Sequence, residues 1–485
     1  MKKMIFIVVA IIIAICIGIG VGYFLLASQG FQPSLNIVGD IKETITLKDL
    51  SEYESQTFIY EGEKLEGVLV QSVLERAGLV NSNSNIYYIG SDGLTAEVDA
   101  TTLSESYLLF NAENGWEMIN LNHPVSANIK LLTDIVVVSQ EEITDGSFTI
   151  FTDEANLFSV TPGKMYMDDY SYFRKLEGES NFKDNFVRIY TSYKTYDMEQ
   201  LINKEGEANS NATSGTLFLE NGQIINAKLD GYLQCDKNQI NYLSYNEEYE
   251  YMDVVGLYLG EPLGYVGDAY YDMQYYLEKG ENVFLLFIDG FNYQTYTTAK
   301  ERGIIPNISS GTMKKSLSVH TSVTNAGFAS MITGKTPDVN GVHSRAERKL
   351  LCDSIFKIAK DKNIDTAFLE GSTRILDTEI SPKLHVRGDL EILESTKKAV
   401  EEDKEFIFVH LHELDEKGHT YGPKHQSLFD YLEEVDKLIG EILKEYEGQL
   451  IITTDHGMHS IGEAGGHGIM RYEDMIIPTL TKKVN

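Results

Sequence analysis

The sequence predicts an α/β fold for residues 282–485, preceded by a transmembrane helix and by β-rich α+β regions. From residue 282 onward, short apolar runs alternate with segments in which apolar residues recur every three or four positions. This alternation is typical of a mostly parallel sheet with helices on both faces. Residues 28–281 carry short apolar runs separated by turn signals instead, and the first residues form one long apolar run.

Individual segments give the elements of the α/β part. Apolar runs predict buried strands, and segments of helical periodicity predict helices, the longest at 427–446. In that helix apolar residues repeat at i, i+3 and i+4, so one face should pack on the sheet and the charged residues should be largely solvated. The strands are expected at 282–290, 365–371, 406–411 and 450–453, a helix at 353–363, and the solvated residues are Glu433, Asp436, Lys437 and Lys444.

A chain of 485 residues is too long for one ordinary domain. We expect an anchor at 1–27, an α+β domain at 28–160, a tyrosine-rich, β-rich region of unknown role at 161–281, and the α/β domain at 282–485.

The formal net charge of −32 argues against a nucleic-acid partner, because phosphate backbones would repel such a surface. A phosphorylated substrate stays compatible with it, since bound divalent cations would invert the field locally. The three cysteines give no disulfide framework.

The amino-terminal run Met4–Ala27 is long enough to cross a membrane and follows Lys2 and Lys3. This lysine asymmetry places the amino terminus in the cytoplasm and the rest of the chain outside the cell. We therefore expect a single-pass cell-membrane protein. A cleaved signal peptide, with Leu25 and Ala27 as weak cleavage positions, is the alternative.

Residues 28–160 combine a helix with helical apolar spacing at 67–79, a hairpin around Asp92-Gly93 and a strand at 134–140. The run from "GVLVQSVLERAGL" through "SDGLTAEV" to "NGWEMINLNHPV" resembles the molybdopterin-binding domain of sulfite-oxidase-type enzymes. No cysteine lies between Cys16 and Cys235, and the arginine-rich segment of that family is missing. We therefore expect a scaffold or binding domain without molybdopterin.

Residues 161–281 are rich in tyrosine and acidic residues, with strands expected at 186–193 and 215–229 and a turn at Asn221-Gly222. The tyrosines favour either a contact surface for cell-surface glycan or, more simply, an ordinary β-rich domain with half-buried rings.

Seven of the eleven histidines fall between His410 and His467, interleaved with Asp415 and Asp455. Both aspartates follow apolar runs that predict strands, and ligands gather at the carboxyl ends of parallel strands. Carboxylate and imidazole donors without thiolates suit a catalytic metal. Surface turns at Asp-Gly and His-Gly pairs would be the alternative interpretation.

Five motifs occur in order: Asp289 after the first strand, then "SVTNAGFASMITGKTPDVNGV", "ELDEKGHTYGP", "TDHGM" and "GGHG". Together they resemble the alkaline phosphatase superfamily, and within it the type I phosphodiesterase and nucleotide pyrophosphatase group, over residues 282–480. The resemblance implies two divalent metal ions. It assigns Asp415, His419 and His467 to one, and Asp289, Asp455, His456 and the hydroxyl of Thr324 to the other.

Such a pair of ions can hold the attacking and leaving oxygens of a displacement at phosphorus, and coordination makes a threonine hydroxyl an effective nucleophile. Thr324 precedes an expected short helix ending near Gly334, whose free N–H groups would stabilise an anion. Its alternative role is a simple helix cap. Zinc is the expected metal and manganese the alternative.

Two residues are expected to bind substrate. Arg345 lies where the phosphodiesterase group carries an asparagine, and its guanidinium can bind phosphate in a bidentate way; a plain surface charge is the alternative. Asn325, beside Thr324, is a second donor. The stretch from Thr324 to Asp415 is too short for the cap of the related mutases, and Cys352 lacks a sulfatase context.

The sequence therefore predicts a membrane-anchored, extracytoplasmic, metal-dependent hydrolase of phosphate esters, either a phosphodiesterase or a phosphatase. A transferase that moves a phosphoryl-linked group onto a surface glycan or lipid is the first alternative, and a surface-binding protein is the second.

Overall fold

The computed structural model describes residues 33–485, except 112, 142–145, 169–170, 183–184, 206–212 and 246–249. The chain divides into two compact units, Met1–Glu141 and Glu142–Asn485. The predicted anchor at 1–27 lies outside the described residues. No helix within the described ranges is long and apolar enough to cross a membrane. The boundaries expected at residues 160 and 281 lie inside the second unit and stay predictions.

The described residues of the first unit form two five-stranded sheets and the α-helix α2. The helix α2 (Val70–Ala77) buries Val73 and Leu74 and ends at Gly78, whose φ of 68° suits glycine. The predicted helix and the hairpin around Asp92-Gly93 are both present. The strand order of one sheet is β2 (Ile45–Leu47), β1 (Leu35–Gly39), β10 (Leu132–Ser139), β5 (Ser84–Gly90), β6 (Thr95–Asp99). The strand order of the other is β3 (Ser55–Tyr60), β4 (Glu63–Leu69), β7 (Ser106–Asn111), β8 (Gly115–Asn120), β9 (Ile129–Lys130).

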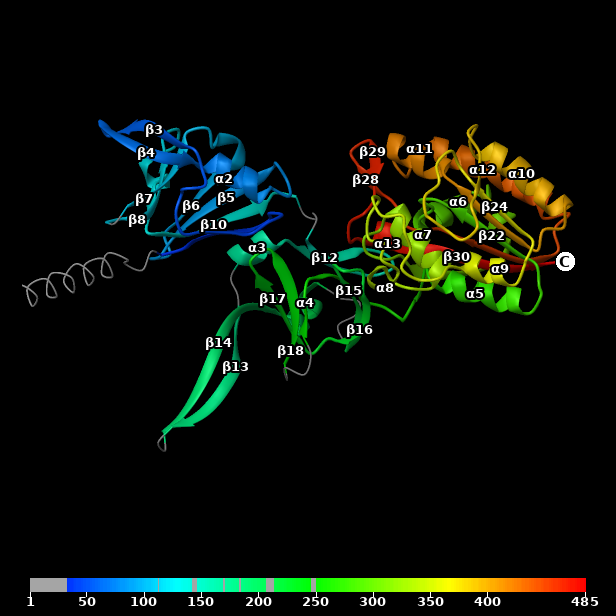
Figure 1. Cartoon of the computed structure of the whole chain (residues 1–485), viewed down its shortest axis with the longest axis horizontal. Coiled ribbons are helices and arrows are strands. Elements are labelled where there is room, and N and C mark those ends of the chain that lie inside the picture. The colour runs from blue at the N-terminus through cyan, green and yellow to red at the C-terminus, as the bar shows by residue number, and fades with distance from the viewer. Residues whose placement is uncertain are drawn as a thin grey trace, which may run out of the picture. The chain divides into compact units, whose positions relative to one another are not determined.

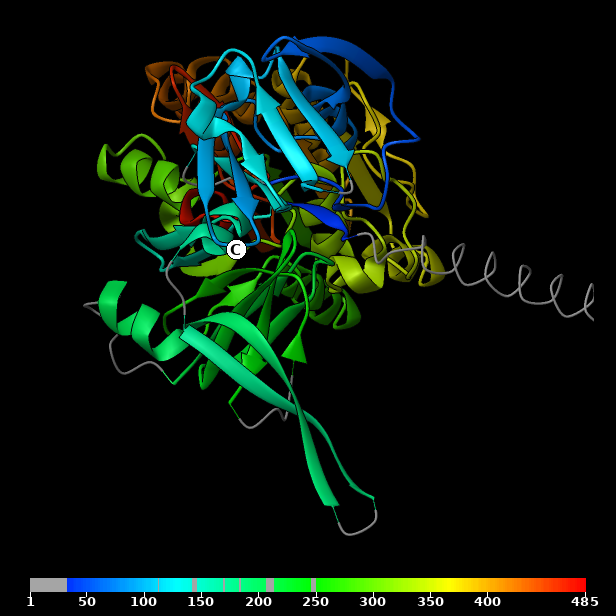
Figure 2. The same ribbon diagram turned by 90° about the vertical axis from the view of Figure 1, so that its left-hand side faces the viewer.

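The second unit begins with two further five-stranded sheets. The expected turn at Asn221-Gly222 joins the antiparallel strands β15 and β16. The long hairpin of β13 and β14 projects away from the other strands of its sheet (Figures 1 and 2). The strand order of one sheet is β12 (Asn156–Val160), β11 (Phe148–Phe151), β20 (Val254–Tyr258), β15 (Ser214–Leu219), β16 (Ile224–Lys228). The strand order of the other is β13 (Ser171–Phe182), β14 (Asn185–Asp197), β17 (Gly231–Asp236), β18 (Gln239–Ser244), β19 (Glu250–Tyr251).

An eight-stranded sheet forms the rest of this unit and confirms the predicted α/β fold. Strand β22 lies at its centre, parallel to both neighbours, while β30 runs antiparallel to its own. All four predicted strands belong to it. The order is β21 (Gly264–Tyr265), β23 (Thr312–Leu317), β30 (Ile476–Val484), β27 (Gly448–Thr453), β22 (Val283–Ile288), β26 (Phe406–Leu411), β24 (Thr366–Glu370), β25 (Lys383–Leu384).

Helices cover both faces of this sheet (Figure 1). Alternate residues of β22 belong to two separate cores, because successive side chains of a strand point to opposite faces. Phe284, Leu286 and Ile288 pack under one layer of helices, and Val283, Leu285 and Phe287 under the other. The first layer contains α6 (Tyr293–Glu301), α10 (Asp389–Glu401) and α12 (Gln426–Ile442), and the second contains α5 (Asp268–Glu278), α7 (Thr324–Thr333) and α9 (Ile355–Asp361).

One residue of the long helix α12 departs from its predicted environment. Asp436, expected to be solvated, is only 2% exposed. Its carboxylate accepts hydrogen bonds from the backbone N–H groups of Asn307 and Ile308, which satisfies donors of a neighbouring turn.

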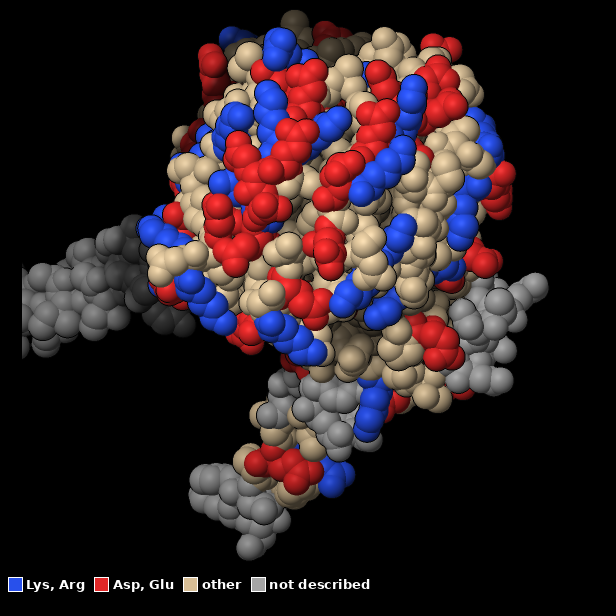
Figure 3. All heavy atoms as spheres, turned by 90° about the vertical axis from the view of Figure 1, so that its right-hand side faces the viewer, with Lys and Arg blue, Asp and Glu red and all other residues tan. Residues whose placement is uncertain are grey.

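On the face drawn in Figure 3, acidic and basic side chains are interspersed rather than gathered into patches of one sign.

Candidate functional site

The three predicted aspartate ligands lie just beyond the carboxyl ends of central strands. Asp289 directly follows β22, Asp455 follows β27 by one residue, and Asp415 lies in helix α11 (Glu413–Tyr421), which begins after β26. Because these strands are parallel neighbours, their carboxyl ends meet at one edge. The topology therefore brings together carboxylates that are far apart in the sequence.

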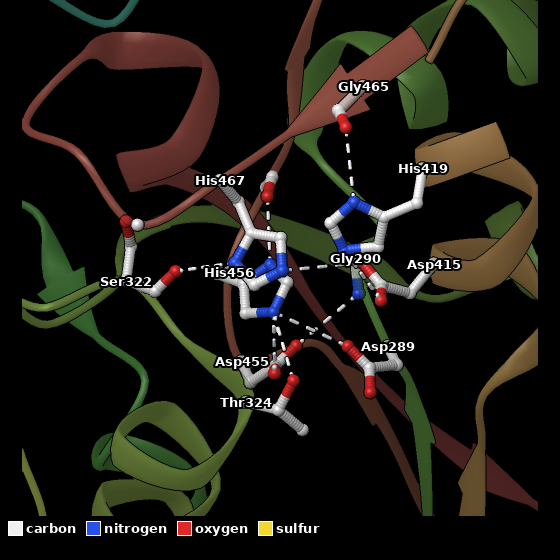
Figure 4. A network of polar contacts seen from close by, with 12 residues as sticks. Asp289, Gly290, Ser322, Thr324, Asp415, His419, Asp455, His456, Gly465 and His467 are labelled. Atoms are coloured by element: carbon white, nitrogen blue, oxygen red, sulfur yellow. Dashed lines mark hydrogen bonds and ion pairs between the residues drawn. The ribbon is translucent and has the colours of Figure 1, made fainter. Parts of the chain in front are cut away.

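The first group contains Asp415, His419 and His467, whose ligand atoms lie within 4.8 Å of one another. Nε2 of His419 is 3.3 Å from one oxygen of Asp415, and Nε2 of His467 is 3.7 Å from the other. Asp415 and His419 are one turn apart on α11, so they share a face of the helix. Figure 4 shows the three side chains converging.

The second group contains Asp289, Asp455 and His456, also within 4.8 Å of one another. All three are buried. Nε2 of His456 lies 3.5 Å from Asp289 Oδ1 and 3.1 Å from Asp455 Oδ2, and the hydroxyl of Thr324 approaches the same nitrogen at 3.3 Å. The structure thus brings Thr324 to the group to which the sequence motifs assigned it.

Backbone carbonyls fix the three imidazoles in one tautomer. Nδ1 of His419 lies 3.1 Å from the carbonyl oxygen of Gly465, and Nδ1 of His467 and His456 lies 2.8 Å from those of Ser322 and Gly457. A carbonyl oxygen only accepts, so Nδ1 carries the proton and the neutral ring presents the lone pair of Nε2. This is the arrangement found in metal-ligating histidines.

Three carboxylate oxygens of the site lack a hydrogen-bond donor among the described residues: Oδ1 of Asp289, Oδ1 of Asp415 and Oδ2 of Asp455. Each is buried and faces an imidazole Nε2. Buried carboxylates need a partner, and an oxygen set against a nitrogen lone pair needs a cation. The donor set therefore fits divalent metal ions.

The electrostatics of the metal-free site point the same way. Burial, and then the charge of Asp415, raises the pKa of Asp289 to about 6. Burial, and then the charge of Asp289, raises the pKa of Asp455 to about 7. Burial and His456 lower the pKa of His467 to about 2. The neighbouring carboxylates Asp289 and Asp455 destabilise each other's charged forms, which is the situation that a bound cation relieves.

Thr324 is the first residue of α7, and the N-cap position is occupied by Val323. The helix ends at Gly334 in the left-handed region with φ of 65°, close to the expected end. At Gly327 a Cβ atom would lie 2.5 Å from the carbonyl oxygen of Asp455. Only glycine lets α7 approach the metal-ligand loop this closely, so Gly327 sets the position of Thr324 against His456.

The two predicted substrate-binding residues have other partners in this structure. Nη2 of the exposed Arg345 lies 2.5 Å from Nε2 of His467, which places the guanidinium at the edge of the first group. The side chain of the buried Asn325 donates to the carbonyl oxygen of Glu347 at 2.7 Å. Asn325 therefore tethers the loop that carries Arg345 to helix α7, and the substrate roles of both residues stay predictions.

The sequence interpretation missed three residues that support Asp289. His410 is fully buried, with Nε2 3.3 Å from Asp289 Oδ2 and Nδ1 3.2 Å from Glu370 Oε1. His412 accepts from the N–H of Gly371 at Nε2, so its Nδ1 carries the proton and faces Asp289 Oδ2 at 3.6 Å. These rings can orient Asp289 by donating to it. The sequence does offer a signal for these residues, because His410 and His412 lie two positions apart at the end of strand β26 and so point to the same face.

The eight-stranded sheet thus presents at one edge six carboxylate and imidazole side chains that could hold metal ions, with the first residue of α7, Thr324, beside them. Residues 358–479 match the model of the type I phosphodiesterase / nucleotide pyrophosphatase family. The family resemblance predicted from the motifs is thereby confirmed for this part of the chain, which contains Asp415, His419, Asp455, His456 and His467.

Two curated relatives match shorter stretches. GPI ethanolamine phosphate transferase 3 of Saccharomyces cerevisiae is 35% identical over 81 residues, which cover 16% of this chain and 8% of the relative. The 2,3-bisphosphoglycerate-independent phosphoglycerate mutase 2 of Methanocaldococcus jannaschii is 40% identical over 60 residues, or 12% and 14% of the two chains. The alignments thus span only a small part of either relative.

Solved structures also show similarity. Murine ectonucleotide pyrophosphatase / phosphodiesterase 5 aligns with 38% of this chain and 59% of its own, at 15% identity and a TM-score of 0.31. Phosphonoacetate hydrolase from Sinorhizobium meliloti aligns with 37% and 56%, at 16% identity and a TM-score of 0.30. The family match over residues 358–479 supports a phosphoester-processing enzyme.

Proposed function

We propose that this chain is a membrane-anchored, extracytoplasmic hydrolase of phosphate esters that uses Thr324 as nucleophile and two divalent metal ions. The observation that carries the proposal is the set of three buried carboxylate oxygens that lack a donor among the described residues, two of which face Nε2 of His456 and one Nε2 of His467. Residues 1–27 would provide the anchor, and the substrate would be a phosphodiester or a phosphomonoester.

The residues of the two groups would hold one ion each. Asp415, His419 and His467 form the first set, and Asp289, Asp455, His456 and Thr324 form the second. When bound, the pair would supply Lewis-acid stabilisation of the phosphoryl oxygens and would acidify the threonine hydroxyl. Zinc suits a site with three histidines, and manganese uses the same ligand types.

Thr324 would form the covalent intermediate. Its Oγ1 bonds to phosphorus while the bond to the alcohol of the ester breaks, and water then releases phosphate or the monoester from the threonine. The free N–H groups at the beginning of α7 could donate to phosphoryl oxygens bound at Thr324, the first residue of the helix. Oγ1 is 3.3 Å from Nε2 of His456, so the hydroxyl lies beside the residues that would hold the second ion.

Arg345 would bind a phosphoryl oxygen. The guanidinium must leave Nε2 of His467 before that nitrogen can act as a ligand, and its side chain is exposed and can turn. A guanidinium released there lies beside the reaction centre, where it can form a bidentate contact with a phosphate.

The full chain, stripped of metal by a chelator and reloaded with zinc or manganese, should hydrolyse p-nitrophenyl phosphate or bis-p-nitrophenyl phosphate. Thr324→Ala is expected to lower kcat by at least about a thousandfold, because it removes the nucleophile itself. Thr324→Ser keeps a hydroxyl and should retain part of the rate. Phosphate trapped on wild type and Thr324→Ser, but not on Thr324→Ala, would identify the intermediate. Unchanged turnover in Thr324→Ala would refute the assignment.

A transferase is the second candidate, favoured by the similarity to the yeast GPI ethanolamine phosphate transferase 3. The same phosphothreonine would then be attacked by an acceptor alcohol in place of water. Product formation that requires an added glycan or lipid alcohol, without release of free phosphate or monoester, would distinguish this activity from hydrolysis.

A further inference from the structure

The two candidate metal-ligand groups are both contacted by one residue outside them, Asp474. This residue lies in the short helix α13 (Tyr472–Met475) and is fully buried. Its Oδ2 accepts hydrogen bonds from the backbone N–H groups of Gly468 at 3.1 Å and Ile469 at 3.3 Å. These two residues directly follow His467, a member of the first group. The carboxylate of Asp474 therefore holds the loop that carries His467.

The backbone of Asp474 contacts the second group. Its carbonyl oxygen accepts from the N–H of Gly457 at 2.8 Å, and Gly457 directly follows His456. Helix α13 passes so close to this point that a Cβ atom on Gly457 would overlap the carbonyl oxygen of Glu473, so only glycine fits here. Asp474 thus joins the loops of both groups, through its carboxylate to one and through its carbonyl to the other.

The ring of His459 makes a further contact with the same carboxylate. Its Nδ1 lies 2.8 Å from Oδ1 and 3.1 Å from Oδ2 of Asp474, and the residue is only 6% exposed. A carboxylate only accepts hydrogen bonds, so Nδ1 carries the proton and donates. His459 begins strand β28 (His459–Ile461), whose antiparallel partner β29 (Ala464–Gly466) leads directly to His467. Both ends of this ribbon are therefore attached to Asp474.

Helix α13 is itself held by the β12-β11-β20-β15-β16 sheet. Asn156 of β12 accepts from the N–H of Tyr472 at 2.9 Å and donates to Oε2 of Glu473 at 3.2 Å. A buried apolar cluster joins the same parts, and its members include Phe151, Phe218 and Val255 of the sheet, Leu317 of β23, and Met470 and Met475 on either side of Asp474. The sheet thus fixes the segment that carries Asp474.

We infer that Asp474 is a positioning residue that sets the separation of the two metal-ligand groups, and that the β12-β11-β20-β15-β16 sheet acts on the site through it. The inference rests on the proposed function, because it takes both groups as metal sites. A displacement of Asp474 moves His467 relative to His456, and a reaction that uses two ions requires them at a fixed separation. The upstream sheet then supports the site without contacting substrate.

The test measures the zinc affinity of the full chain by competition with a chromogenic chelator. Asp474→Asn keeps the shape of the side chain but leaves one acceptor oxygen, which cannot serve both the loop N–H groups and His459. We expect the affinity of the first group to fall by roughly ten- to a hundredfold. The matched control is Asp436→Asn, since Asp436 is equally buried and accepts two N–H groups of the turn at Asn307. Wild-type affinity in Asp474→Asn, or an equal loss in the control, would overturn the inference.

The part played by the sheet is tested with Asn156→Ala, which removes both polar contacts with α13 and leaves the apolar cluster in place. Its zinc affinity should fall by about two- to tenfold, the usual effect of lost hydrogen bonds. In the Asp474→Asn background the same substitution should cause little further loss, because the sheet acts through Asp474. Losses that multiply in the double variant would overturn this part of the inference.

Hydrogen exchange separates the inference from the proposed function, because it needs neither metal nor substrate. In the chelated full chain, Asp474→Asn should speed up exchange at the amides of Gly457, Gly468 and Ile469, while Asp436→Asn should do so only at its own turn. Faster exchange and weaker zinc binding in a chain that turns over no phosphate ester would overturn the proposed function and support the inference. Ester turnover, with exchange and zinc affinity unchanged in Asp474→Asn, would do the reverse.

Discussion

Nδ1 of His456 lies 2.8 Å from the carbonyl oxygen of Gly457, the next residue in the chain. In its neutral form the ring therefore carries its proton on Nδ1, and the lone pair of Nε2 is directed toward Asp289, Asp455 and Thr324. A local backbone contact thus favours the tautomer in which this histidine can act as a metal ligand.

The two ligand groups should be separable by mutation. Asp415→Asn is expected to remove the first ion and Asp455→Asn the second, because each substitution takes an anionic ligand from only one group. Metal content measured by elemental analysis after dialysis should fall from about two ions per chain to about one in either variant. Two ions retained in both variants would contradict the ligand assignment.

Support from His410 should appear in metal affinity. His410→Phe keeps the ring volume against Phe287, whose ring it stacks on at 3.8 Å, but removes the contact with Asp289. We expect the affinity for zinc to fall by roughly ten- to a hundredfold, the usual effect of removing a group that orients a ligand. Competition with a chromogenic chelator would measure it. His123→Gln, at a partly exposed histidine of the first unit, serves as control, and an equal loss there would refute the role of His410.

The metal-free protein should lose stability as the pH rises. The pKa values of Asp289 and Asp455 are raised to about 6 and about 7 in the folded chain, against 3.8 in the unfolded one. Between pH 4 and pH 7 the unfolded state therefore releases protons more readily, which favours unfolding. Two groups act in the opposite sense: Asp415, whose pKa is lowered to about 2, below pH 4, and His467, whose pKa is lowered from 6.5 to about 2, below pH 6.5. The loss of stability is therefore steepest above pH 6.5.

Differential scanning calorimetry at pH 5 and pH 8 would measure this effect. The Tm of the chelated protein should fall between the two values, and the fall should be smaller after metal is restored, because the ionised carboxylates then have a cation. Asp455→Asn should weaken the pH dependence of the chelated protein. A chelated Tm that rises with pH over this window would contradict the expectation.

Gly327→Ala should displace helix α7. The added Cβ would lie 2.5 Å from the carbonyl oxygen and 2.7 Å from Cβ of Asp455, so one of the two segments must move, at a cost of about 1–3 kcal/mol. We expect a lower Tm and a loss of turnover. Gly178→Ala is the matched control, because nothing lies within 4 Å of its added Cβ. Equal effects of the two variants would argue against a specific contact.

The sequence predicted the aspartates at the strand ends because each follows a run of buried-type residues that is visible locally. It could not predict the support of Asp289, because Glu370 and His410 meet only when β24, β26 and β22 pair in register. Asp436 was assigned to the solvated face for the same reason. The helical period shows which face of the helix is polar, but the turn at Asn307 that covers Asp436 comes from a distant part of the chain.

The apolar cluster that joins the β12-β11-β20-β15-β16 sheet to Leu317 and Met475 limits how the protein can be shortened. A fragment starting at residue 282 would lose strand β21 and helix α5, whose Met273 packs beneath β22, and would expose the face that Phe218 covers. Such a fragment should aggregate even if every metal ligand were present. Truncation would therefore report on folding rather than on catalysis, and point substitutions are the informative route to the role of the upstream residues.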